Sequence, residues 1–267
     1  MPALQAIASL RCMYSDAATG GVADVHWLTD ASPLELTNAA VSFCNGNNSN
    51  DTTQVFVTSH EGRFVAESYS ATGRRINFCG HGALAAARVV FDQHAAGANE
   101  CEFSNAEQSW RARYSADCIA LTYSQSSVEV CSMPTFAKAA LGVQPLAAAT
   151  VGGSSGYLLL QLADAELVKS LQPDYALITA ATERSLIVTA QADNIHPPGC
   201  VFRYFAPQYG TPEDAATGSA AIQLAAFWSP HFDGSPFTAW QLSPQGAEMQ
   251  LSCSGSTVDL TARVGYR

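Results

Sequence analysis

Two short glycine-containing segments of the chain carry residue types that can exchange protons near neutral pH. The first is Cys79-Gly80-His81-Gly82, and in the second Glu213-Asp214 precede Ala215-Ala216-Thr217-Gly218-Ser219. An imidazole and a carboxylate brought together can act as general acid and general base on one substrate. His81 and Asp214 are therefore the first candidates for catalytic residues.

Each of these candidates also has a structural alternative that the sequence leaves open. His81 could make a purely structural hydrogen bond, and Asp214 could cap a helix. Cys79 could face the ligand or be a small buried residue, which is how free cysteines commonly behave.

Both segments stand at the start of an apolar, alanine-rich stretch, and we expect helices over residues 82–91 and 217–228. A helix N-terminus carries unpaired N–H groups and a partial positive charge, so it binds an anion without lysine or arginine. Glycine there lets a ligand approach the backbone closely. We expect the two ends to face one cleft and hold a small carboxylate-bearing molecule. The residues expected to contact it are Cys79, Gly80, Gly82, Thr217, Gly218 and Ser219.

The two helices must be buried, because they are apolar on nearly every side, and each therefore needs a sheet around it. Strands are predicted at 54–58 and 63–70, and again at 157–162, 185–189 and 202–205. The repeated plan favours two related halves, although any two alanine-rich helices look alike. The predicted domains are 1–128 and 129–267, with the last strand, 258–264, free to return to the first half.

Composition narrows the class of protein. The chain has 267 residues, of which 48% are hydrophobic and 13% charged, with a formal net charge of −10. That composition favours a compact fold, and the acidic balance disfavours nucleic acid as a partner. No targeting segment or transmembrane stretch is recognised, so we expect a cytoplasmic protein with reduced cysteines that does not bind membranes. The spacing of the histidines predicts no metal site, and no nucleotide-binding motif is present.

The two segments resemble motifs of the PhzF-like (phenazine biosynthesis) isomerase and epimerase family. Residues 77–87, NFCGHGALAAA, resemble its CGHATLAAA motif, and residues 202–220, FRYFAPQYGTPEDAATGSA, resemble its RYFAP…G…EDPATGSA motif. The resemblance covers nearly the whole chain in the correct order. It implies an α+β, diaminopimelate-epimerase-like fold with two pseudo-symmetric domains, each a β-barrel-like antiparallel sheet around a central helix. It also implies proton-transfer chemistry without a cofactor.

The sequence departs from the family pattern at the catalytic glutamate, which stands in an NLSET-type run just before a strand. Aligned without gaps, that position is Thr53, whose hydroxyl is no base near neutral pH. A slip of two residues makes it Asp51, which is our candidate acid/base group, with an exposed loop residue as the alternative.

Smaller departures affect both motifs and the start of the chain. Gly82-Ala83 replaces the Ala-Thr of the first motif, and Ala215 replaces the proline of the second. The family's early GNP element is absent near residues 20–24. Two-thiol epimerases of this fold carry a second cysteine before the second Thr-Gly, where this chain has Ala216, so we do not expect a two-thiol mechanism.

The sequence therefore predicts a cofactor-independent isomerase or epimerase acting by acid/base proton transfer. The competing hypothesis is a catalytically impaired protein of the same fold that binds a small carboxylate. The substrate and the oligomeric state stay open, a homodimer included.

Overall fold

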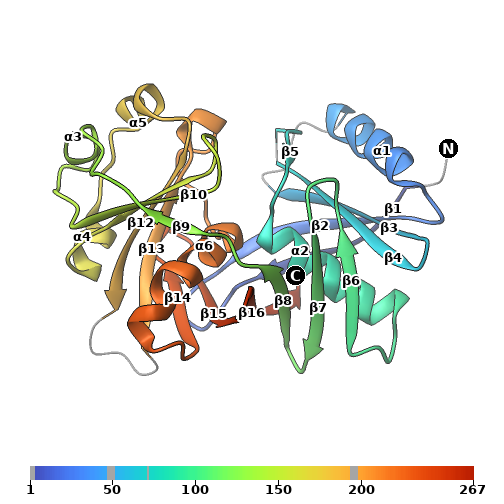
Figure 1. Cartoon of the computed structure of the whole chain (residues 1–267). Helices are drawn as coiled ribbons and strands as arrows, with labels where there is room; N and C mark the ends of the chain where they lie inside the picture. The colour runs from blue at the N-terminus through green and yellow to red at the C-terminus, as the bar shows by residue number, and fades with distance from the viewer. Residues whose placement is uncertain (1–3, 47–51, 71, 193–197) are drawn as a thin grey trace. The chain divides into compact units, whose positions relative to one another are not determined.

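The fold is described from a computed structural model over residues 4–46, 52–70, 72–192 and 198–267 (Figure 1). The chain forms two compact units. The first comprises Met1–Tyr123 and Asp259–Arg267, and the second comprises Ser124–Val258. The predicted candidate Asp51 lies outside the described residues.

The first unit is a closed barrel. Its strands are β1 (Leu4–Cys12), β2 (Gly21–Leu28), β3 (Thr53–His60), β4 (Arg63–Tyr69), β5 (Arg75–Ile76), β6 (Glu100–Ser104), β7 (Ser109–Ser115), β8 (Cys118–Ser124) and β16 (Thr257–Tyr266). The order around the barrel is β1-β2-β3-β4-β6-β7-β8-β16, and β16 closes it by pairing with β1. The short strand β5 pairs with β4.

Helix α2 (Gly80–Val89) is enclosed by this barrel and contacts β1, β2, β3, β4 and β7. Its alanines and glycines are buried on all sides, because small side chains let several strands approach one helix. The predicted buried helix is thus confirmed, although it starts at Gly80 and continues into a π-helical turn at Val90–His94.

A second helix, α1 (Pro33–Gly46), packs on the opposite face of the same strands. Its buried residues Leu36, Ala40 and Cys44 join Phe56 of β3 and Tyr69 of β4 in one cluster. The helix starts at a capping box, in which the backbone N–H of Ser32 donates to Glu35 and that of Glu35 to the Ser32 hydroxyl. Successive residues of β3 point to opposite faces, so odd-numbered Thr53 and Val55 face α2 and even-numbered Gln54 and Phe56 face α1.

The second unit is a mixed sheet between α6 and three short helices. Its strands are β9 (Val128–Val130), β10 (Ala147–Val151), β11 (Tyr157–Gln161), β12 (Ser185–Ala192), β13 (Gly199–Phe205), β14 (Phe237–Gln241) and β15 (Ala247–Ser254), in that order across the sheet. The helices are α3 (Ala137–Leu141), α4 (Ala165–Ser170), α5 (Tyr175–Ala181) and α6 (Gly218–Trp228).

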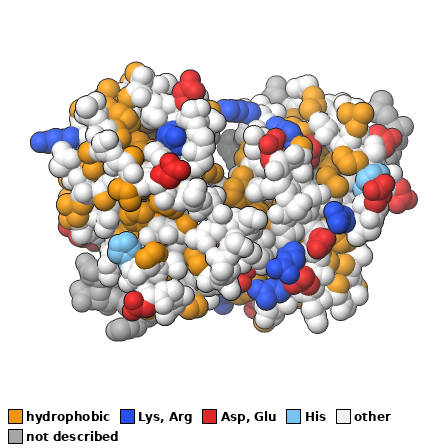
Figure 2. All heavy atoms as spheres, viewed as in Figure 1, with side chains coloured by type: hydrophobic (Ala, Val, Ile, Leu, Met, Phe, Trp, Pro, Cys, Tyr) orange, Lys and Arg blue, Asp and Glu red, His pale blue; other side chains and the backbone are white. Residues whose placement is uncertain are grey.

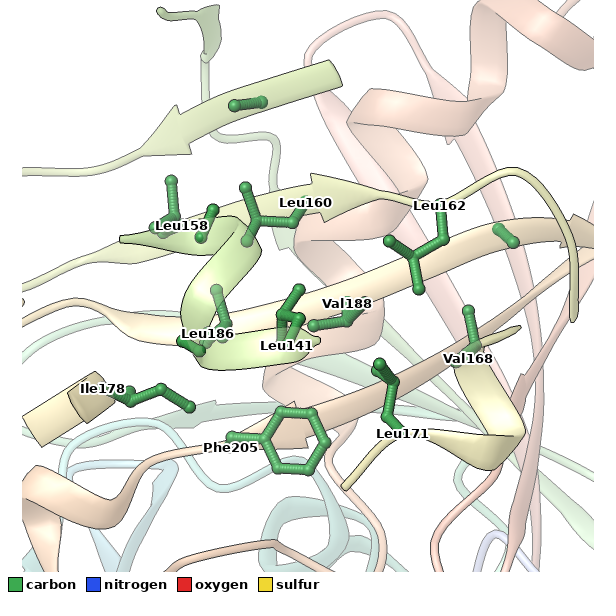
Figure 3. Packing of buried hydrophobic residues seen from close by; sticks show 14 of the residues in the cluster. Leu141, Leu158, Leu160, Leu162, Val168, Leu171, Ile178, Leu186, Val188 and Phe205 are labelled. Atoms are coloured by element: carbon green, nitrogen blue, oxygen red, sulfur yellow. The ribbon is translucent and has the colours of Figure 1, made fainter. Parts of the chain in front are cut away.

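Alternation along the strands explains how both faces of this sheet are buried. Leu158 and Leu160 of β11 pack with Val188 of β12 under α3, α4 and α5 (Figure 3). On the other face, Trp228 of α6 donates its indole N–H to the hydroxyl of Thr189 of β12 at 3.0 Å. The helix predicted at 217–228 is confirmed as α6, which is buried along most of its length.

The two units share one connection pattern. In each, a parallel pair of strands is joined through an outer helix, β2–α1–β3 and β11–α4–α5–β12. Each also has a parallel pair joined through its central helix, β4–α2–β6 and β13–α6–β14. Parallel neighbours need such long crossovers, whereas antiparallel ones need only a turn. The expected α+β plan of two similar halves is confirmed, with the correction that the sheets are mixed and not purely antiparallel.

The charged side chains of the face drawn in Figure 2 are interspersed by sign. Among the described residues, no helix is long and apolar enough to cross a membrane.

Candidate active site

His81 lies in the first turn of α2 and is only 9% exposed. Its Nε2 is 2.8 Å from the hydroxyl of Thr53, the first residue of β3. A hydroxyl both donates and accepts, so it can bond to the ring in either protonation state. Thr53, the ungapped counterpart of the family's catalytic glutamate, is therefore beside the histidine but acts as a hydrogen-bond partner.

Cys79 is the N-cap residue of α2, and its side chain makes no capping hydrogen bond. Its Sγ lies 3.8 Å from the ring nitrogens of His81, a weak contact for sulfur. Cys79, Gly80, His81 and Gly82 are thus brought together at one helix start, as the sequence predicted for the first segment.

Gly82 is closely surrounded by side chains at this helix start. A Cβ added there would lie 2.5 Å from Ser68 Oγ and 3.1 Å from Cys79 Sγ. The family motif has alanine at this position, and the glycine of this chain leaves room there for the Ser68 hydroxyl.

A small open hollow borders this helix start within the first unit. Ser68, Cys79, Trp110 and Tyr123 are among the residues that line it. None of these except Cys79 was singled out from the sequence, because they come from separate strands of the barrel.

Asp214 lies just before α6 in the second unit, in a loop fixed by hydrogen bonds. The Thr217 hydroxyl donates to Asp214 Oδ2 at 2.6 Å. The side chain of Gln241, at the end of β14, donates to the Asp214 carbonyl at 2.6 Å and accepts from the Thr217 backbone N–H at 2.6 Å. Ser243 donates to the carbonyl of Ala215. Thr217, and not Asp214, is the N-cap residue of α6, and it makes no side-chain cap.

The residue before Asp214 is anchored by a buried ion pair. Arg203 of β13, 7% exposed, donates from Nε and Nη2 to the two carboxylate oxygens of Glu213, each at 2.7 Å. Its Nη1 donates to the carbonyl of Leu171, just beyond α4, at 2.7 Å. Paired hydrogen bonds of this kind fix direction as well as distance. The sequence could have indicated this ion pair, since an arginine within an apolar strand requires a partner of opposite charge.

Two tyrosines border the same loop. Tyr157 interacts with Ser219 of α6, and Tyr204 with Ser185. Burial raises the pKa of both phenols, and for Tyr204 the nearby charge of Asp214 adds to the effect. Both phenols therefore keep their protons at neutral pH and can donate hydrogen bonds.

The predicted site residues thus fall into two sets. His81, Cys79, Gly80 and Gly82 belong to the first unit, and Asp214, Thr217, Gly218 and Ser219 to the second. That the two sets act on one ligand stays a prediction. Among the described residues, no group of histidine, cysteine and acidic side chains could hold a metal ion.

Comparison with known proteins gives a consistent result. Residues 42–264 match the family model described as phenazine biosynthesis-like protein. An uncharacterized isomerase of Pseudomonas aeruginosa is 30% identical over 185 residues, which is 69% of each chain. An uncharacterized isomerase of Vibrio cholerae is 30% identical over 198 residues, 73% of this chain and 67% of that protein.

Solved structures show the same fold at lower identity. A phenazine biosynthesis protein of the PhzF family from Enterococcus faecalis superposes with a TM-score of 0.83 at 22% identity, over 97% of this chain and 95% of that one. A hydroxyproline epimerase from Agrobacterium vitis, with bound trans-4-hydroxy-L-proline, superposes with a TM-score of 0.62 at 9% identity, over 100% of this chain and 92% of that one.

Proposed function

We propose that this chain moves a proton on a small carboxylate-bearing metabolite without a cofactor. The proposal proceeds from its family, since the chain belongs to the phenazine biosynthesis-like protein family and is an isomerase. One observation carries the proposal. The two central helices, α2 and α6, both start at glycine-containing turns whose N-cap side chains leave the helix end uncapped, and a proton-exchanging residue stands at each.

The helix starts would hold the carboxylate. Backbone N–H groups of the first turn and the helix dipole favour an anion there, and no lysine or arginine is required. In the second unit, the Thr217 N–H is already used by Gln241, so Gly218 and Ser219 are the better donors. Cys79, Gly80 and Gly82 would contact the ligand from the first unit.

The proton transfer would be shared between the two sets. One side chain removes a proton from the carbon beside the carboxylate, and the electron pair delocalises into the carboxylate. A second side chain then returns a proton to another carbon or to the other face. Asp214 has Oδ2 occupied by Thr217, so Oδ1 is the oxygen that would meet the substrate. His81, oriented by Thr53, would share the proton, and Asp51 is the proposed additional acid/base group.

A panel of carboxylate metabolites tests this proposal, first by thermal shift and then by turnover. A ligand that binds only the folded state stabilises it by RT ln(1 + [ligand]/Kd) and so raises the melting temperature. Isomerisation of a hit in metal-free buffer without added nucleotide supports the proposal. Turnover that depends on an added metal or nucleotide contradicts it, and tight binding without turnover favours a carboxylate-binding protein.

A further inference from the structure

The hollow beside the start of α2 contains polar groups that the proposed reaction does not use. Trp110 of β7 is 5% exposed, and its indole Nε1 has no hydrogen-bond partner among the described residues. A buried donor left unpaired is destabilising, because it has lost its hydrogen bonds to water. An indole nitrogen only donates, so the group that would satisfy Trp110 must be an acceptor.

Two hydroxyls line the same hollow. Tyr123 of β8 is 3% exposed, and burial keeps its pKa far above neutral, so the phenol retains its proton. Ser68 of β4 is also buried, with its hydroxyl directed at the start of α2 beside Gly82. Both hydroxyls can donate toward the acceptor that Trp110 requires.

The rest of the lining limits the chemistry further. None of the described residues around the hollow is Asp, Glu, Lys, Arg or His. An ammonium group would therefore enter without a counter-charge. The aromatic walls are closely packed, with the rings of Phe78 and Tyr123 4.8 Å apart and those of Trp110 and Tyr123 5.9 Å apart. Such walls favour a small, flat group.

We propose that this hollow is a binding subsite for a small oxygen-acceptor group, a carbonyl or carboxyl, which accepts from Trp110, Tyr123 and Ser68 beside the Cys79 thiol. The assignment of that group to the substrate rests on the function proposed above, whereas occupancy of the hollow does not. The subsite selects for an acceptor substituent and against an amino substituent at that end of the ligand.

The indole N–H of Trp110 reports directly on occupancy. The chain has four tryptophans, so proton–nitrogen correlation spectra of the ¹⁵N-labelled protein contain only four indole signals to assign. Loss of a signal in Trp110→Phe identifies Trp110, and the signal of Trp228, already bonded to Thr189, is the matched control. The probes are acetamide, acetate and methylammonium at equal concentrations.

We expect a saturable shift of the Trp110 signal with acetamide or acetate, no shift with methylammonium, and a stationary Trp228 signal. Binding of acetamide would indicate that the subsite takes a neutral carbonyl, and binding of acetate that it takes a carboxylate. Tyr123→Phe should weaken that binding severalfold, and Ala66→Leu, which fills the hollow, should abolish it.

Two outcomes overturn the proposal: no saturable shift with either acceptor in the wild-type protein, or an equal shift with methylammonium. The wild-type spectra decide this even if Ala66→Leu does not fold. None of these measurements requires turnover, so a negative result leaves the proposed isomerase standing. Acceptor binding in a protein without isomerase activity would instead contradict the proposed function alone.

Discussion

His81 and Asp214 are held differently, although each stands just before or within the first turn of a buried helix. His81 receives a partner from a neighbouring strand, since Thr53 bonds to its Nε2. Asp214 is held from within its own loop by Thr217 and through Gln241. Both arrangements fix the direction of a group that the proposed reaction uses, and precise direction is what acid/base catalysis needs.

Substitution of these two residues separates catalysis from structure. His81→Ala and Asp214→Asn should each reduce turnover by roughly 10²-fold or more, because each removes a group that handles the proton. Asp214→Asn keeps an acceptor for Thr217, so its melting temperature should stay near that of the wild type. The measurements are turnover and melting temperature on the same preparations.

Thr53→Val is the matched control for His81, since it keeps the shape but removes the hydroxyl. A turnover loss smaller than that of His81→Ala is expected, because the ring stays but is less well oriented. Wild-type turnover in both His81→Ala and Asp214→Asn would assign these motifs to the scaffold.

At the scale of elements, Arg203 connects three segments, because it joins β13 to Glu213 and to the end of α4. Removing one member of such a buried pair leaves an uncompensated charge, whereas removing both can be nearly neutral. The pair therefore contributes more to the position of the loop before α6 than to net stability.

Arg203→Met should thus destabilise the protein by roughly 3–5 kcal/mol, and Arg203→Met with Glu213→Leu should recover most of that loss. Turnover should stay low in the double variant, because the loop carrying Asp214 has lost its anchor. Denaturant unfolding measures the first effect and steady-state kinetics the second. A double variant with wild-type turnover would show that the ion pair does not position Asp214.

The layer between α1 and β3 contains a buried histidine. His26 of β2 is 5% exposed, its Nε2 lies 2.7 Å from Gln54 Oε1, and its ring is packed against Phe43 and Phe56. Burial lowers the pKa of His26, while Gln54 and the charge of Asp24 oppose the shift. The folded state therefore binds this proton less readily than the unfolded chain, so its contribution to stability falls as the pH drops below about 6.5.

In His26→Gln, the melting temperature should decrease less between neutral pH and about pH 5 than it does in the wild type. The glutamine can still bond to Gln54, but it does not titrate near the ordinary pKa of histidine. His60→Gln, at the other end of β3, is the control. An unchanged pH dependence in His26→Gln would show that this histidine is not protonated on unfolding.

At the scale of the whole molecule, the central helices and the general plan could be predicted from the sequence. Stretches as apolar as α2 and α6 can only be stable when enclosed. The contacts that support the site could not be predicted, because they join residues far apart in the chain. Thr53 and His81 are one such pair, and Thr217 and Gln241 another. The register that makes Thr53 face α2 depends on where β3 starts, and residue types alone do not fix that.

Gly82, which departs from the family motif, and Arg203, which matches it, differ in how far the sequence reveals their contacts. Gly82 leaves room for the Ser68 hydroxyl, which an added Cβ would approach to 2.5 Å, and local sequence gives no sign of that contact. Arg203 is different, since its partner Glu213 is the nearest acidic residue after the strand and could have been predicted.

Solvent deuterium incorporation tests the central claim, that groups of this chain move a proton on carbon, most directly. The enzyme and its substrate are incubated in D₂O through many reversible turnovers, and product and remaining substrate are analysed by mass spectrometry. The account predicts carbon-bound deuterium in both pools, since the group that returns a proton is not the group that removed one and takes its hydrogen from solvent. It also predicts a roughly 10²-fold slower appearance of deuterium in His81→Ala and Asp214→Asn. Full conversion with no deuterium in either pool, or deuterium appearing at the wild-type rate in both variants, would contradict it.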